Sequence, residues 1–287
     1  MTFNKLTRLT KTIIFIMSVA AAFTLLLSFM LSFDPQNGYF RMSALPIIFI
    51  IIYASGIIAS IILPHVASLK PSTVRVQAPN KGIANTQAIL SVLCVFAGLA
   101  TILFYPSITL DEYVYIGLGS VFFGLYFLIA APKPNSKMLK LILLAPSLAL
   151  PFGIIFGNNS NFARHINSVE NILCAIFCIF FSAYIYNKGR NLSDDRITKW
   201  QLGFNLAAVF TGSAFSVSYI FSFLLGSVNE ISRLFHAVIM LFVSLICASD
   251  LFTVRDNDVE DENASQSIET PESFENPENS DNEEQPE

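Results

Sequence analysis

The sequence predicts an all-α protein, a polytopic transmembrane helical bundle of about eight spans that ends in a disordered acidic C-terminal tail. Composition is the first observation behind this prediction, and the spacing of apolar segments and of basic residues supplies the other two. Of the 287 residues, 53% are apolar and 13% are charged, whereas soluble domains average roughly 45 to 50% and about a quarter. Lipid rather than water is therefore predicted to surround most of the chain.

Eight apolar stretches have about the 20 residues that a helix needs to cross roughly 30 Å of hydrocarbon. They form the predicted transmembrane domain, residues 1–252, and lie near 13–33, 45–67, 87–106, 113–132, 141–157, 168–187, 202–225 and 231–252. The fifth stretch contains Pro146 and Pro151, and a proline removes a backbone donor and clashes with the preceding turn. We therefore expect a kink or a break in the fifth span.

The basic residues alternate between the two sides of the predicted bundle. Lys and Arg are retained preferentially on the cytoplasmic side of short loops, and 14 of the 17 basic residues fall at the termini or in the alternate loops that share one side. Arg41, Arg164 and Arg233 fall on the other side. The sequence therefore predicts an integral protein of the plasma membrane with both termini in the cytoplasm. A cleaved signal peptide is disfavoured, because the first apolar run continues past the small residues at 19–22.

The acidic residues are concentrated at the carboxy-terminal end. Residues 253–287 hold 13 of the 21 Asp and Glu residues but one basic residue, Arg255, which leaves 16 basic and 8 acidic residues in the rest of the chain. The tail has too few apolar side chains to offset the entropy of ordering, so we expect it to be disordered. It is interpreted as a solubilising tail, with a docking arm for a basic partner as the alternative.

Residue patterns that carry catalysis or bind metal ions are scarce. The sequence contains no HExxH, P-loop or GxSxG motif, no CxxC pair, and no histidine at zinc-site spacing from a cysteine. The four cysteines lie in apolar runs and are interpreted as buried apolar side chains: Cys94, Cys174, Cys178 and Cys247. We therefore expect no catalytic residues, no metal site and no cofactor.

Two helix faces are more polar than the rest of the predicted bundle. Asn205, Ser216 and Tyr219 fall within about 80° of arc on the seventh span, and Arg233 and His236 share a similar arc of the eighth. The short turn between the spans makes them antiparallel neighbours. A polar cavity is predicted from these five residues together with the two prolines of the fifth span, Pro146 and Pro151. The alternative is simple helix packing, with Arg233 reaching the outer interface.

The aromatic residues at one end of the bundle predict an interfacial belt. Tyr184, Tyr186 and Trp200 fall near the predicted inner boundary of the sixth and seventh spans, where amphipathic rings are enriched. Lys188 follows the sixth span and is interpreted as a loop charge. Anionic lipid headgroups are the expected partners of these basic loops.

The scarcity of catalytic motifs leads to two hypotheses for the function. The favoured hypothesis is a non-enzymatic membrane bundle, either a small-solute permease or the membrane-embedded subunit of a complex. The alternative is an intramembrane enzyme acting on a lipid or lipid-linked substrate, with Arg233 and His236 binding a phosphate. The expected partners are the lipid bilayer, its anionic headgroups and, for a subunit, another membrane protein; nucleic acid is not expected.

Overall fold

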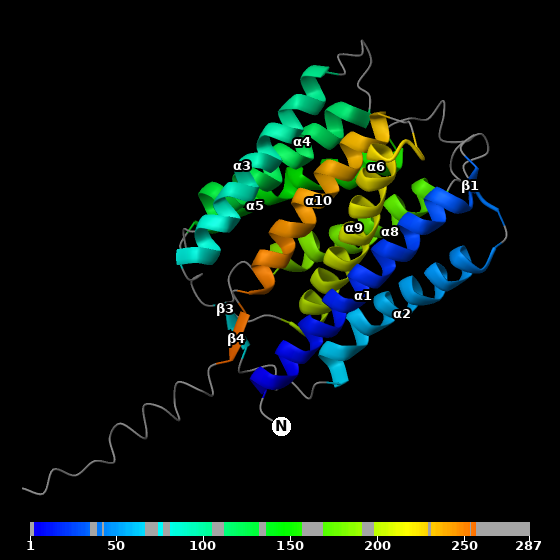
Figure 1. The fold of residues 1–287 in the computed structure, drawn as a ribbon. Helices are drawn as coiled ribbons and strands as arrows, with labels where there is room; N and C mark the ends of the chain where they lie inside the picture. The colour runs from blue at the N-terminus through cyan, green and yellow to red at the C-terminus, as the bar shows by residue number, and fades with distance from the viewer. Residues whose placement is uncertain are drawn as a thin grey trace, which may run out of the picture. The chain divides into compact units, whose positions relative to one another are not determined.

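The computed structural model, drawn in Figure 1, describes residues 3–34, 39–41, 43–66, 74–76, 81–104, 112–131, 136–156, 169–190, 198–228, 231–252 and 254–256. Within these ranges, eight helices are long and apolar enough to cross a membrane. The predicted all-α class and the eight spans are confirmed, so the chain has the architecture of a multi-pass membrane protein. Residues 257–287 of the predicted acidic tail lie outside the described residues.

Helices form nearly all of the described chain. They are α1 (Phe3–Leu31), α2 (Ala44–Val66), α3 (Lys81–Phe104), α4 (Glu112–Leu125), the π-helix η1 (Tyr126–Ala130), α5 (Lys137–Leu144), the 3-10 helix η2 (Ala145–Leu148), α6 (Ala149–Phe156), α8 (Val169–Arg190), α9 (Lys199–Leu224) and α10 (Ile231–Leu251). Two short antiparallel pairs accompany them: β1 (Phe33–Asp34) with β2 (Tyr39–Phe40), and β3 (Val74–Val76) with β4 (Val254–Asp256).

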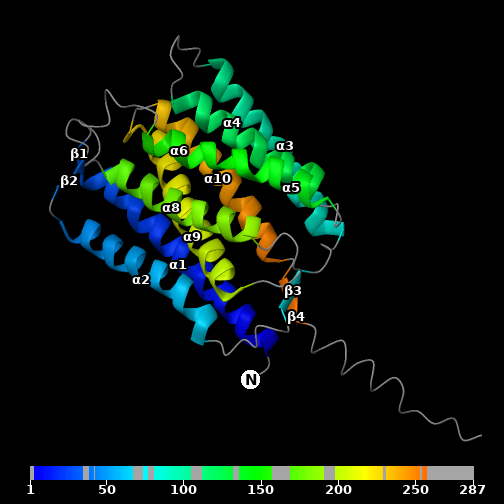
Figure 2. The same cartoon turned by 180° about the vertical axis from the view of Figure 1, so that it is seen from behind.

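Helix α9 is the centre of the bundle and packs against α1, α2, α8 and α10 (Figures 1 and 2). Of its most apolar window 67% is buried, against 28% for α2 and for α3, which form part of the periphery. Small residues permit this close packing. A Cβ atom at Gly212 would overlap the Phe177 ring of α8 and the Ser244 side chain of α10, and one at Gly56 of α2 would overlap the Phe210 ring of α9.

The fifth span is interrupted, as the two prolines predict. Helix α5 ends at Leu144, a 3-10 turn follows, and α6 continues the span. Pro146 lies at the start of the 3-10 turn, and Pro151 lies in the first turn of α6, where a backbone N–H would have no helical partner. The backbone of Leu150 lies so close to α4 that a Cβ atom at Gly119 would overlap it. The broken span is therefore packed tightly on α4.

A turn with helix-capping hydrogen bonds joins α9 to α10. Gly226 has a φ of 74°, a left-handed conformation that favours glycine. Its N–H donates to the Phe223 carbonyl at 3.0 Å, and the Ser227 N–H donates to the Ser222 carbonyl at 2.9 Å. These two bonds make a Schellman motif. The motif ends α9 and returns the chain, so α9 and α10 are antiparallel neighbours, as the short turn predicts.

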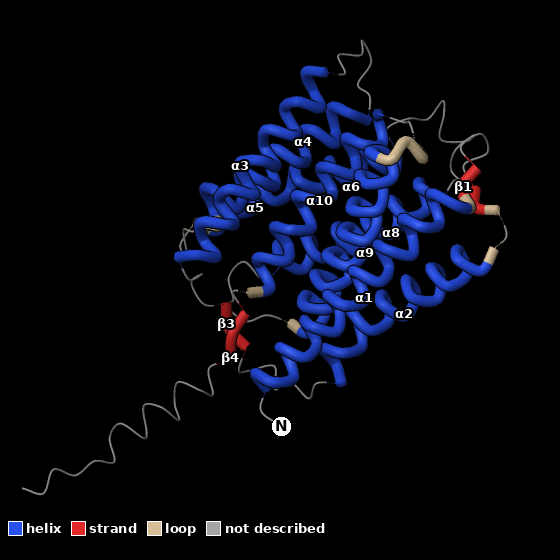
Figure 3. The backbone as a smooth tube through the Cα atoms, viewed as in Figure 1, coloured by secondary structure: helices blue, strands red, loops and turns tan. Residues whose placement is uncertain are grey.

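One end of the bundle gathers three distant parts of the chain, and we call it the basic end. Strand β4 follows α10 and pairs with β3, which lies between α2 and α3, with Arg75 opposite Arg255 in register. Strand β4 also contacts α1, which begins nearby (Figure 3). The β3 segment and the residues after α10 therefore lie at the same end, as the basic alternation predicts. That this end faces the cytoplasm stays a prediction.

Candidate functional site

The predicted polar residues of α9 are buried in the bundle. Asn205, Ser216 and Tyr219 all belong to the buried set, and neither the Asn205 Oδ1 nor the Ser216 Oγ has a hydrogen-bond partner within the described part of the chain. The Tyr219 ring packs edge-on against Phe29 of α1, with the ring centres 5.9 Å apart. These residues therefore contribute polar groups to a packed interior.

The predicted polar residues of α10 lie near the opposite end from Asn205. His236 is 1% exposed, and its ring centre lies 5.7 Å from that of Tyr113 on α4. Arg233, one turn earlier, is partly buried. Asn205 is 19 residues before the end of α9, whereas His236 is near the start of α10, so the two lie on the order of 20 Å apart along the bundle. The structure does not bring them together, and the predicted shared cavity stays a prediction.

An ion pair that the sequence interpretation missed connects α8 to α10. The Lys188 Nζ lies 2.6 Å from the Asp250 Oδ2, and each side chain is 14% exposed. The Tyr184 hydroxyl donates to the same carboxylate oxygen at 2.8 Å. Tyr184 is therefore buried beside an ion pair rather than placed in an interfacial belt, and Lys188 belongs to α8 rather than to a loop. Tyr186 and Trp200, in contrast, are exposed, and their place in an interfacial belt stays a prediction.

Aromatic rings surround the Lys188 ammonium. Its Nζ lies 5.1 Å from the ring centre of Phe127, 5.5 Å from that of Tyr184 and 5.8 Å from that of Tyr126, distances at which the ring quadrupole attracts a cation. Tyr126 and Phe127 open the π-helix η1 at the end of α4. The ion-pair cluster, defined as Lys188, Asp250 and these three rings, therefore clamps α4, α8 and α10 together.

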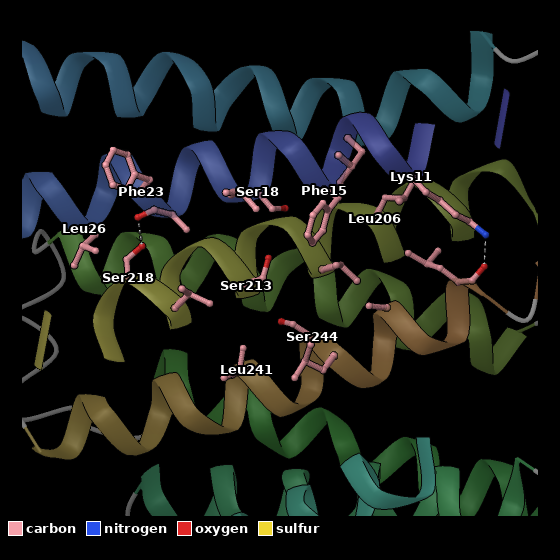
Figure 4. A pocket seen from close by; sticks show the side chains of 18 of the residues that line it. Lys11, Phe15, Ser18, Phe23, Leu26, Leu206, Ser213, Ser218, Leu241 and Ser244 are labelled. Atoms are coloured by element: carbon pink, nitrogen blue, oxygen red, sulfur yellow. Dashed lines mark hydrogen bonds between the residues drawn. The ribbon is translucent and has the colours of Figure 1, made fainter. Parts of the chain in front are cut away.

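An elongated groove runs between α1, α9 and α10 and has a cavity volume of about 650 Å³ (Figure 4). Lys11 lies at one end and Leu26 at the other, a separation of about 22 Å along α1 at 1.5 Å per residue. The exposed rings of Phe15 and Phe23 form its rim on α1, and that of Phe221 forms its rim on α9. The groove is therefore open on the side of the bundle that would face lipid.

The lining of the groove is apolar along most of its length, and its polar groups are one lysine and four serines. The Lys11 Nζ donates to the Leu251 carbonyl at the end of α10, at 2.6 Å, and lies 5.3 Å from the centre of the Phe252 ring. The Ser218 hydroxyl of α9 lies 2.7 Å from the Ala22 carbonyl of α1 and 2.6 Å from the Ala214 carbonyl of its own helix, so its single hydrogen is shared between the two acceptors. The groove is thus mainly apolar, and the Lys11 ammonium lies at its basic end.

One serine of the groove has a hydroxyl without a partner. Ser244 of α10 lines the groove and is 1% exposed, and its Oγ makes no hydrogen bond to any described residue. Figure 4 shows it between α10 and α9, across from Ser213. A buried hydroxyl without a partner costs free energy, so a ligand with an acceptor oxygen at this position would be stabilised.

None of the seven residues predicted for a polar cavity lines this groove. No protein-family model, curated protein or solved structure matches the chain. Within the described residues, no three His, Cys, Asp or Glu side chains are grouped so that they could hold a metal ion. Interpretation of the function therefore depends on the groove and the ion-pair cluster themselves.

Proposed function

We propose that the protein is a non-enzymatic multi-pass membrane protein that holds one acyl chain of a membrane lipid in the groove between α1, α9 and α10. The observation that carries this proposal is the shape and lining of the groove. Its volume of about 650 Å³ is within the usual range of ligand sites. Its length of about 22 Å exceeds half of the roughly 30 Å hydrocarbon layer, which is the depth that the tails of one leaflet occupy, so an extended chain fits lengthwise.

The bilayer constrains how such a site can select its ligand. Lipid tails are as apolar as the groove, so burial from water contributes nothing to the preference for one chain over another. Selection must come from close packing along three helices and from the polar groups at the basic end. Helix α1 packs along α9, and the Ser218 hydroxyl contacts the Ala22 carbonyl between them, so two walls of the groove are preformed. A preformed groove orders a chain at a lower entropic cost.

Lipid binding suits a membrane-embedded subunit, because an ordered lipid can fill the space between neighbouring proteins. A small-solute permease is the second candidate, and the break between α5 and α6 is the observation that favours it, since discontinuous helices line substrate sites in transporters. The tight packing of Leu150 on Gly119 argues for a structural break instead. We therefore place the lipid-binding function first.

Retention of lipid by the purified protein tests the proposal. Native mass spectrometry after exhaustive washing in mild detergent should show one lipid per chain. Ala22→Phe and Ala248→Phe introduce rings into the groove and should abolish retention without lowering the melting temperature. Ala54→Phe, on the exposed face of α2, is the matched control and should retain the lipid. A wild-type protein that carries no lipid, or filled variants that carry as much, would contradict the proposal.

The orientation of the bundle is a second part of this proposal. We propose that the basic end faces the cytoplasm, which is supported by the 14 to 3 asymmetry of the basic residues. Reporter fusions after residue 287 and within 134–139 should then read as cytoplasmic, and a fusion within 158–163 as external. An external carboxy terminus would reverse the leaflet from which the groove takes its lipid.

A further inference from the structure

We infer that the groove is a site for an anionic phospholipid, whose phosphate binds Lys11 at the basic end. This inference rests on the proposed function, because recognition of the headgroup presupposes an acyl chain in the groove. Two observations support it: the position of Lys11 at one end of the groove and the unpartnered hydroxyl of Ser244.

Lys11 is the charged residue among those that line the groove, and it lies at the end of the groove where α1 begins and α10 ends. Its hydrogen bond to the Leu251 carbonyl uses one of the three N–H donors of an ammonium group. The contact with the Phe252 ring and that hydrogen bond hold the ammonium in place. Two donors remain for oxygen acceptors, and a phosphate oxygen makes the stronger, charge-assisted hydrogen bond.

The charge of the helical part of the chain is compatible with an anionic ligand. Residues 1–252 carry 16 basic and 8 acidic residues, and basic residues at a membrane surface attract anionic lipids. Strand β4, which follows α10, contacts α1, the helix that carries Lys11. Lys11 therefore lies at the end of the bundle where α1 begins and α10 ends.

Ser244 distinguishes a phospholipid from a simple fatty acid. It is seven residues from Leu251 on α10, which places it about 10 Å deeper in the groove than the Lys11 contact. Between the phosphate and the tails of a phospholipid lie ester carbonyls, which accept hydrogen bonds. A fatty acid has its acceptor oxygens at one end only, so it cannot satisfy Lys11 and Ser244 together. The groove thus presents donors at two depths, which matches the acceptors of a phospholipid.

A competition between lipids with identical chains tests the inference. Delipidated protein is incubated with equal amounts of phosphatidylglycerol and phosphatidylcholine, with oleate as a third competitor, and the bound species are counted by native mass spectrometry. Wild type should bind phosphatidylglycerol with a preference of about ten-fold over phosphatidylcholine. Added salt should weaken this preference. This arm uses the unmodified chain, so it does not depend on the folding of any variant.

Variants of Lys11 then locate the recognition. Lys11→Gln should bind the same total lipid with less than about two-fold preference, whereas Lys11→Arg should keep the preference because it keeps the charge. Lys81→Gln, an exposed lysine at the start of α3, is the matched control and should behave as wild type. A melting temperature recorded for each variant separates lost recognition from a lost contact to Leu251.

The possible results of these binding experiments separate the headgroup inference from the acyl-chain function. Equal binding of the two phospholipids by wild type overturns the headgroup inference and leaves the acyl-chain function standing. A preference that survives in Lys11→Gln also overturns it, because recognition then lies elsewhere. Displacement of both phospholipids by oleate overturns the assignment of a phospholipid. Absence of any bound lipid overturns the proposed function itself.

Discussion

The ion-pair cluster and the polar residues of α9 and α10 are two regions of one bundle that treat buried polar groups differently. In the cluster, Asp250 forms an ion pair with Lys188 and accepts a hydrogen bond from the Tyr184 hydroxyl, and aromatic rings surround Lys188. In the other region, His236 and Ser244 are 1% exposed, and their polar side-chain atoms have no partner among the described residues. The difference shows that charges are kept inside this bundle with partners, whereas neutral polar groups are tolerated without them.

Free energies explain this difference. An uncompensated charge in a protein interior costs several kcal/mol, whereas a neutral group without a hydrogen bond costs about 1 to 3 kcal/mol. A bundle can therefore contain a few buried neutral groups without hydrogen bonds. Water or a ligand that binds beside such a group is stabilised by the hydrogen bond that it supplies. The cluster is therefore a structural clamp, and Ser244 is a candidate ligand contact.

The largest effect is expected from breaking the ion pair. Asp250→Asn leaves Lys188 without its anion, so the free energy of unfolding should fall by about 3 to 5 kcal/mol. Reversible unfolding in bicelles measures this. The double variant Lys188→Met with Asp250→Leu removes both charges and should return to within about 1 kcal/mol of wild type. If the single variant is as stable as the double, the pair is not a clamp.

A smaller effect, of opposite sign, is expected at His236. His236→Phe keeps a ring beside Tyr113 and removes two nitrogens that have no partner within the described chain, so stability should rise by about 1 kcal/mol. His65 is the matched control, because its Nδ1 lies 2.9 Å from the Ile61 carbonyl and its ring contacts Trp200. His65→Phe should lower stability by about 0.5 to 1 kcal/mol. A loss of several kcal/mol in His236→Phe would reveal a bound partner.

The smallest effect is expected at Ser244, which is compared with the buried Ser120 in delipidated protein. The Ser120 hydroxyl donates to the Cys94 carbonyl at 2.9 Å and joins α4 to α3, whereas that of Ser244 has no partner in the described structure. Ser120→Ala should lower the free energy of unfolding by about 1 kcal/mol. Ser244→Ala should leave it unchanged or slightly higher. Equal losses would mean that Ser244 is paired within the protein, which would remove it as a lipid contact.

Much of the fold could be predicted from the sequence. The eight spans follow from the lengths of apolar runs, and the break in the fifth span follows from Pro146 and Pro151, because proline acts through local sterics. The antiparallel pairing of α9 and α10 follows from a short turn. These features depend on neighbouring residues, so a single chain contains enough information for them.

The candidate site could not be predicted in the same way. The residues that line the groove on α1, such as Phe15, Val19 and Phe23, recur at helical spacing. Apolar residues also occupy the other faces of α1, so hydropathy does not distinguish the groove from the lipid surface. Lys188 and Asp250 are 62 residues apart, and their pairing depends on how α8 and α10 both pack on α9. One signal was present: Asp250 is an acid within an apolar span, and such a residue requires a partner.

The pairing of β3 with β4 has a consequence for the order in which the protein is made. Arg75 and Arg255 are 180 residues apart, and a ribosome adding about 5 to 20 residues per second needs roughly 10 to 40 s to synthesise the chain between them. Until α10 has entered the bilayer, the third wall of the groove does not exist and α1 meets ambient lipid along that face. Closure of β3 on β4, together with the bond from Lys11 to Leu251, then completes the groove. Under the proposed lipid-binding function, the groove closes around lipid that already lies against α1, so assembly and loading are one event that follows the synthesis of α10.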